Sequence, residues 1–227
     1  MINLISMFNE SPQMALIYLI STFLACCIAI SFHEWAHAFV AYKLGDPTAK
    51  NMGRMSLDPM KHMDPIGMIL FVILGIGWAK PVIVNSRNLK NFRRDDVLIS
   101  LAGPVTNLIL SFIFYGLYVL AANIFISSGS LTSSNILPYA IVQLFYIVFQ
   151  LNIVLAVFNV LPIPPLDGFH VVSSLFIRKN YPVVAFLQKY GFIILIILIF
   201  SGAISAVISP IINGLAGVYS AFYGLFM

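Results

Sequence analysis

Long uncharged runs alternate with short polar segments along this chain. Residues 13–32 carry no charged side chain, and the apolar helical pattern continues to about Gly45. Two further apolar runs follow at 97–125 and 136–161. Each of the three is long enough to cross a bilayer, because a membrane-spanning helix needs about 20 residues. The pattern therefore predicts a helical protein that crosses a membrane several times.

The remaining apolar segments are shorter or more ambiguous. The run at 66–77 has 12 residues, which favours a re-entrant or interfacial segment. β-branched residues there and at 81–85 would also permit a small β-hairpin. Near the C-terminus, 192–209 predicts one span, and 212–227 predicts a shorter return or an interfacial helix. We therefore expect an all-α polytopic membrane protein with five or six transmembrane helices and a re-entrant or β-hairpin-like segment near 66–84.

Composition agrees with a membrane location. Of the 227 residues, 60% are hydrophobic and only 9% are charged, and the mean hydropathy is +0.98. These values lie outside the range of soluble globular chains. We treat 1–227 as one integral membrane domain. Because the N-terminal segment has no basic residue, a cleaved signal peptide is not expected.

The basic residues predict an orientation in the cell membrane. Nine of the 12 fall between Lys43 and Arg94 and three between Arg178 and Lys189, whereas the N-terminus and the loop at 127–135 have none. By the positive-inside rule, both basic windows face the cytoplasm and the N-terminus lies outside. The net charge of +4 does not predict a nucleic-acid partner, since the basic residues are interleaved with membrane segments. The expected environment is the lipid bilayer.

An H-E-x-x-H pattern lies inside the first apolar run. On a helix, His33 and His37 fall on one face, so both can bind one Zn²⁺. Glu34 is offset by one position, from which it can reach a metal-bound water as a general base. Ionisable residues inside a membrane are costly and usually functional. The pattern predicts a zinc-hydrolase site.

A second unusual stretch, residues 159–170, interrupts an apolar region with three prolines and then Asp167. Proline cannot continue helical hydrogen bonding, so the backbone should open here. Asp167 lies 11 residues before Arg178 and His33 lies ten before Lys43. At about 1.5 Å per residue, both lie roughly 15 Å from the cytoplasmic charges. Asp167 can therefore be the third zinc ligand; the rival candidates are His170 and the presumed solvated His62.

Several polar or helix-disturbing residues lie within the other spans. We expect Gly103 and Pro104 to disturb the first turns of their helix, and Asn107 to need a protein partner. Gln143 and Gln150 favour hydrogen bonds between helices. Cys26 and Cys27 are adjacent, which makes them poor disulfide partners, so we expect them to serve packing.

These motifs together resemble the site-2 protease family of intramembrane zinc metalloproteases. The resemblance rests on HEWAH at 33–37 and NVLPIPPLDG at 159–168, and it extends over about residues 20–180. LGDPTAKNMGRMSLDPMKHMDPIG, GWAKPV and LAGPVTN are also similar to the short bacterial and archaeal members. One departure is that Pro164 and Pro165 stand together, which leaves one residue fewer before Leu166 than the looser family forms allow.

The resemblance implies roles for individual residues. His33, His37 and Asp167 would bind one zinc ion per chain, Glu34 would be the general base, and Asn159 would hold the substrate backbone or the developing oxyanion. The catalytic core would cover about residues 13–180. The substrate would be a transmembrane protein, in some cases one already cut by another protease, as in regulated intramembrane proteolysis. There is no room in 227 residues for a PDZ or CBS domain, and neither substrate identity nor oligomeric state follows from the sequence.

Two other readings compete with a protease. A membrane transporter or channel could use the same polar groups as a zinc or ion pathway, but such proteins usually have an internal repeat, and none is visible. A non-proteolytic homologue would not need Glu34. Within the protease interpretation, the segment at 66–84 would offer an exposed edge to a substrate in extended conformation.

Overall fold

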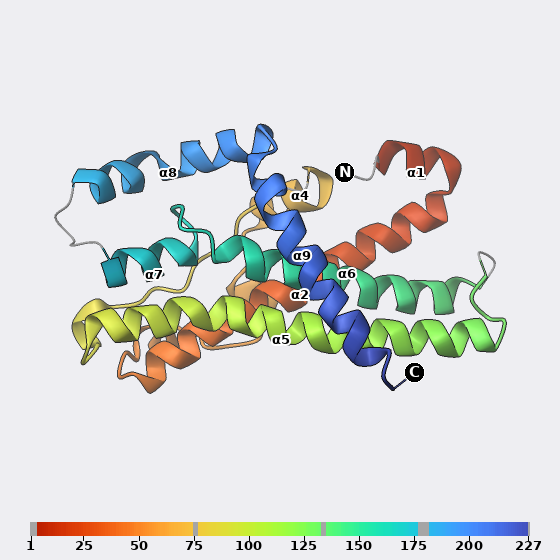
Figure 1. Ribbon diagram of the computed structural model, residues 1–227, viewed down its shortest axis with the longest axis horizontal. Coiled ribbons are helices and arrows are strands. Elements are labelled where there is room, and N and C mark those ends of the chain that lie inside the picture. The colour runs from red at the N-terminus through yellow and green to blue at the C-terminus, as the bar shows by residue number, and fades with distance from the viewer. Residues whose placement is uncertain (1–3, 75–76, 133–134, 177–181, 227) are drawn as a thin grey trace.

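The computed structural model describes residues 4–74, 77–132, 135–176 and 182–226 (Figure 1). Its elements are α1 (Leu4–Glu10), α2 (Pro12–Lys43), α3 (Thr48–Asn51), η1 (Pro59–Lys61), α4 (Pro65–Leu74), η2 (Ser86–Asn88), α5 (Phe92–Ser127), α6 (Ile136–Asn159), α7 (Asp167–Phe176), α8 (Pro182–Phe200) and α9 (Ala203–Tyr223). Five of them, α2, α5, α6, α8 and α9, are long and apolar enough to cross a membrane. The predicted all-α polytopic fold is confirmed.

The long helices α2, α5 and α6 form the centre of the molecule. They lie side by side, with α2 and α6 running in one direction and α5 in the other (Figure 1). Small residues line the buried face of α2: Ala15, Ala25, Ala29, Ala36, Ala38 and Ala41. Because small side chains let helix backbones approach closely, this face packs tightly against α5 and α6.

Helix α5 begins earlier than the hydrophobic pattern indicates and is not interrupted. Asn91 caps it by accepting a hydrogen bond from the Arg94 N–H, and the Asp95 carboxylate accepts one from the Asn91 N–H at 2.9 Å. The helix then passes through Gly103 and Pro104 without a break, so the prediction of disturbed first turns was wrong. Membrane helices tolerate proline when neighbouring helices enclose it, and both residues are buried.

The short apolar run near residue 66 forms helix α4, and residues 77–85 follow it without regular secondary structure. Among the described residues, the only sheet-like pairing is one isolated antiparallel bridge between Met63 and Ala79. The sequence left a re-entrant or interfacial segment and a β-hairpin as alternatives here. The described residues form a short helix followed by an irregular stretch, and they do not form a hairpin. Cys26 and Cys27 pack against Met63 here as free cysteines, in agreement with the expected packing role.

The C-terminal helices cover the central three. Helix α7 packs against α5, whereas α9 crosses α5 and α6 obliquely (Figure 1). Tyr219 of α9 is buried among aromatic residues, and its hydroxyl lies 3.0 Å from the Ser111 hydroxyl of α5. Helix α8 contacts α9 and lies along the side of the molecule that also carries α7. Arg178 and Lys179 of the second basic window lie outside the described residues.

Candidate metal centre

Helix α2 presents two imidazoles from consecutive turns of one face. His33 and His37 are four residues apart in an unbroken helix, so their rings lie one above the other with centroids 4.6 Å apart. Each residue has only 8% of its surface exposed. Buried polar groups need partners, so the hydrogen bonds of these rings determine what the pair can bind.

The third polar group comes from the broken region after α6. Helix α6 ends at Asn159, and α7 begins at Asp167 after a turn that contains the three prolines. Gly168 is required at this turn, because a Cβ there would overlap the backbone of Val160 and Leu161. Leu166 anchors the turn in a hydrophobic cluster with Leu195 of α8 and Ile204 of α9. The turn thereby directs Asp167 toward α2.

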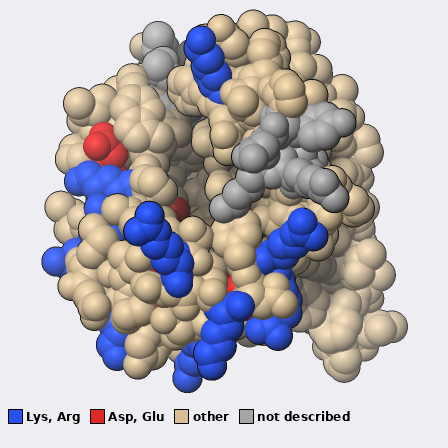
Figure 2. All heavy atoms as spheres, turned by 90° about the vertical axis from the view of Figure 1, so that its left-hand side faces the viewer, with Lys and Arg blue, Asp and Glu red and all other residues tan. Residues whose placement is uncertain are grey.

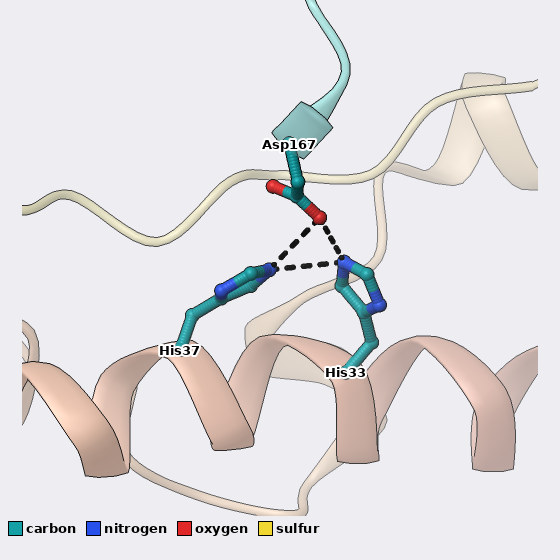
Figure 3. A group of neighbouring side chains, drawn as sticks. All are labelled: His33, His37 and Asp167. Carbon is teal, nitrogen blue, oxygen red and sulfur yellow. Dashed lines mark hydrogen bonds and ion pairs between the residues drawn. The ribbon is translucent and has the colours of Figure 1, made fainter. Parts of the chain in front are cut away.

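The three side chains converge on one point (Figure 3). Oδ2 of Asp167 lies 3.2 Å from His33 Nε2 and 3.3 Å from His37 Nε2, and the two Nε2 atoms are 3.0 Å apart. The structure thus brings together His33, His37 and Asp167, which sequence spacing and depth had placed at one level.

The protons of both imidazoles are directed away from this point. His37 Nδ1–H donates to the Ile99 carbonyl at 2.7 Å, and His33 Nδ1–H donates to the Asn107 side-chain oxygen at 2.5 Å. In the neutral form of each ring, Nε2 therefore carries the lone pair and does not donate to Asp167. Accordingly, the buried Oδ2 of Asp167 has no hydrogen-bond donor.

This arrangement fits a zinc ion. Zinc bonds histidine nitrogen and carboxylate oxygen at about 2.0–2.2 Å in a tetrahedron, whose ligand atoms are then roughly 3.4 Å apart. The separations of 3.0–3.3 Å among the three atoms are close to that value. Three lone pairs directed at one another repel, and a cation between them removes the repulsion. Three protein ligands also leave the fourth position open, as in catalytic zinc sites.

Helix α5 closes the site from behind. A Cβ at Gly103 would lie less than 3.0 Å from ring atoms of both His33 and His37. Only glycine, which has no Cβ, lets the α5 backbone come this close. Gly103 therefore shapes the candidate metal site, whereas the sequence analysis predicted only that it would disturb the helix.

Glu34 lies beside the metal ligands on a cavity of about 820 Å³. Its Oε2 accepts a hydrogen bond from the Val82 N–H at 2.9 Å. The described lining of the cavity comprises Glu34, His37, Pro81, Val82, Val84, Ser86, Phe92, Arg93, Asp96, Ile99, Ser100, Pro165, Asp167, His170, Ser173, Ser174, Val184 and Gln188. The surface is hollowed at the end of the molecule where these elements meet, and Lys and Arg side chains gather around the hollow (Figure 2).

An extended stretch of chain forms one wall of this cavity. Val82 and Val84 line it, whereas Ile83 between them is exposed. Asp46 holds the end of the stretch: its carboxylate accepts hydrogen bonds from the Asn85 N–H at 2.7 Å and the Asn88 side chain at 2.7 Å. The wall is therefore anchored at Glu34 and at Asp46.

The other candidate residues lie apart from the three converging atoms. Asn159 donates its side-chain N–H to the Leu155 carbonyl of its own helix at 3.0 Å, and it is not among the described residues that line the cavity. His170 lines the cavity but is exposed and does not join the three ligands. His62 is fully buried, with Nε2–H donating to the Ser56 carbonyl at 2.7 Å, so the prediction that it is solvated was wrong.

Two amides in the spans have roles that sequence spacing did not identify. Asn107 has the protein partner that was expected, and that partner is His33. Asn152 accepts a hydrogen bond from Asn107 of α5 and donates to the Val148 carbonyl of its own helix, whereas Gln150 donates to Tyr146 of its own helix instead of the expected neighbour. The sequence could have indicated the buried position of Asn107, because Gly103, Asn107 and Ser111 recur every four residues and share the buried face of α5.

Known proteins were compared with this chain. The model of Peptidase family M50 matches residues 21–202. A protein named "Putative zinc metalloprotease YwhC" from Bacillus subtilis (strain 168) is 41% identical over 202 residues, which are 89% of each chain. "Putative zinc metalloprotease Rip2" from Mycolicibacterium smegmatis is 26% identical over 78% of this chain and 66% of its own length. "Putative zinc metalloprotease MJ0611" from Methanocaldococcus jannaschii is 30% identical over 69% of this chain and 71% of its own length. No solved structure matches.

Proposed function

The chain belongs to peptidase family M50, the site-2 protease family of membrane-embedded zinc metalloproteases, and we propose that it hydrolyses peptide bonds in or near transmembrane segments of other membrane proteins. The observation that carries this proposal is the convergence of His33, His37 and Asp167 beside Glu34 on one cavity. The substrates would be membrane proteins that are processed by regulated intramembrane proteolysis, including proteins first cut by another protease.

One zinc ion per chain would be held by Nε2 of His33, Nε2 of His37 and Oδ2 of Asp167. When bound, zinc supplies Lewis acidity, which polarises the scissile carbonyl and makes water more acidic. The donor set suits this purpose, since two imidazoles and one carboxylate form a common catalytic zinc site. The lone pairs of all three side chains already face the same point, so little side-chain rearrangement accompanies metal binding.

Glu34 would accept the proton of the attacking water and deliver it to the leaving amine. It is on the same helix as the two histidines and borders the cavity, so it can reach a water next to a bound substrate. Its present partner, the Val82 N–H, ties it to the cavity wall. A substrate that pairs with this wall would therefore come next to the general base.

A substrate would bind in extended conformation along the wall at Val82–Val84. Alternate side chains of the wall face the cavity, as in an edge strand. Within the described chain, the backbone groups of Ile83 and Val84 have no hydrogen-bond partner. A substrate backbone can satisfy them by β-strand addition, which also exposes its own carbonyl for attack. Asn159 would contribute to substrate or oxyanion binding after a rotation that releases the Leu155 carbonyl.

The cavity would face the cytoplasmic side of the cell membrane, with the N-terminus outside. The described basic residues gather at the end of the molecule where α2 ends and α5 begins (Figure 2), which supports this orientation by the positive-inside rule. Substrates would accordingly be cut toward the cytoplasmic end of their transmembrane segments.

The decisive experiment uses the purified full chain in lipid vesicles with a membrane-spanning test substrate. Wild type should bind one zinc ion per chain and cleave, and Asp167→Ala should lose both properties. Glu34→Gln should keep the zinc and lose cleavage. Zinc flux across the vesicles without any cleavage by wild type would contradict the proposal and favour a transporter.

A further inference from the structure

The two histidines of the metal site are oriented by different kinds of acceptor. His37 donates to a backbone carbonyl, that of Ile99, which is fixed by the α5 helix. His33 donates to the side-chain oxygen of Asn107, and an amide side chain fits its space almost equally well when its oxygen and nitrogen are exchanged. An exchanged Asn107 would offer an N–H to His33, which would then carry its own proton on Nε2. The tautomer of His33 therefore depends on the orientation of Asn107.

Two acceptors determine that orientation. The Asn107 side-chain N–H₂ group donates to the Ala29 carbonyl of α2 at 3.2 Å and to the Asn152 side-chain oxygen at 2.7 Å. Asn152 is held in turn by its own N–H₂ group, which donates to the Val148 carbonyl of α6 at 2.8 Å. Both asparagines are fully buried, so water cannot replace these partners. The direction of every hydrogen bond from Val148 to His33 is thereby fixed.

We propose that Asn152 and Asn107 form a positioning relay that keeps the proton of His33 on Nδ1 and its Nε2 lone pair free, and so sets the affinity of the site for zinc. The relay rests on the proposed zinc-binding function and adds to it two residues that do not contact the metal. Outer partners that orient a metal-binding histidine are typically worth 10–100-fold in metal affinity.

The relay also couples the metal site to the position of helix α6. Asn152 lies two turns before the end of α6, and the turn that follows this helix carries Asp167. One helix therefore orients a ligand on α2 through Asn107 and is joined at its C-terminal end to the turn that carries another ligand. A displacement of α6 would disturb both ligands together.

Zinc affinity in detergent solution, measured by competition with a chelator, tests the relay. Asn107→Leu should weaken zinc binding by about 10–100-fold. Asn152→Leu should weaken it by a smaller factor, because the Ala29 carbonyl still holds Asn107. Since Asn152 acts through Asn107, the double variant should bind zinc no more weakly than Asn107→Leu alone. Gln150→Leu is the matched control on α6 and should leave the affinity unchanged.

The tautomer of His33 gives a readout that a purely structural role would not move. In zinc-free wild type labelled with ¹⁵N-histidine, at a pH where the ring is neutral, His33 should carry its proton on Nδ1, and Asn152→Leu should increase the fraction with the proton on Nε2. The His33 signal is assigned by its loss in His33→Gln. This measurement on wild type decides the question even if Asn107→Leu does not fold.

Two results would overturn the relay. One is a neutral His33 in wild type that carries its proton on Nε2, and the other is a double variant whose loss equals the two single losses combined. Either result would leave the proposed function intact, which fails instead if His37→Ala and Asp167→Ala bind zinc as wild type does.

Discussion

Replacing Gly103 by alanine tests the close approach of α5 to the metal site with a single methyl group. The new Cβ would lie 2.6 Å from His33 Nε2 and closer still to His37 Nε2. Ordinary van der Waals contact begins at 3.4 Å, so the new Cβ and His33 Nε2 must separate by about 0.8 Å, and the new Cβ and His37 Nε2 by more. Metal sites tolerate deviations of roughly 0.2 Å in ligand distances. Gly103→Ala should therefore lose zinc, in addition to an overpacking cost of about 1–3 kcal/mol.

A second glycine on the same helix provides the matched control. A Cβ at Gly116 would also meet a ring closer than 3.0 Å, but the ring is that of Tyr223 on α9. Gly116→Ala should therefore lower the unfolding temperature while keeping the zinc stoichiometry. The assay is metal content after gel filtration, together with thermal unfolding in the same detergent. If Gly103→Ala retains zinc with wild-type affinity, the argument from the close approach is refuted.

Three further variants test separate parts of the site. Glu34→Gln should keep zinc affinity within about twofold and reduce cleavage of a membrane-spanning substrate by at least about 100-fold, the usual contribution of a general base; comparable cleavage would exclude Glu34 from that role. Ser174→Ala removes the hydrogen bond to Asp96 that joins α7 to α5. It should destabilise the protein by about 1.5–3 kcal/mol in chemical unfolding and weaken zinc binding several-fold; unchanged unfolding would mean that this bond does not hold α7. Burial raises the pKa of Asp46, but hydrogen bonds from Thr48, Asn88 and the Asn85 N–H outweigh it and hold the pKa below its usual value. The stabilisation from the carboxylate is therefore present above the unfolded-state pKa of about 3.9 and is lost as the pH falls through the lower folded value. Wild type should lose stability below about pH 4 more steeply than Asp46→Asn, and equal slopes would contradict this assignment.

The convergence of His33, His37 and Asp167 was predictable because its geometry is local or follows from depth in the membrane. His33 and His37 need only an unbroken helix, and α2 runs from Pro12 to Lys43 without interruption. Asp167 was placed at the same level by counting residues to the basic windows, and α6 and α2 do run in the same direction. Such counting gives the level of a residue along the membrane normal, and it gives no information about which side of a helix the residue faces.

The sequence analysis misjudged residues whose role depends on which side of their helix or loop faces the protein interior. The sequence around Gly103 and Pro104 contains two helix-disfavouring residues, yet the packing of α5 against the histidines makes the glycine necessary. His62 belongs to a charged loop, but its backbone carbonyl accepts from the Lys80 N–H at 2.7 Å, and its side chain is fully buried. The contact that buries His62 has no periodic signature in the sequence.

The hydrogen-bond inventory of the buried core agrees with the proposed metal site. Asn107 and Asn152 have acceptors for their N–H₂ groups, and both histidines have acceptors for their Nδ1 protons. Among the described residues, the buried side-chain atoms without a hydrogen-bond partner are Thr22 Oγ1, Ser31 Oγ, His62 Nδ1 and Asp167 Oδ2. The first three are single atoms on separate parts of the chain, and each leaves one modest interaction unmade. Asp167 Oδ2 differs because the Nε2 atoms of two imidazoles lie within 3.3 Å of it. When both rings are neutral, a water could donate to only two of these three acceptors, whereas one divalent cation would satisfy all three at once and also balance the carboxylate charge.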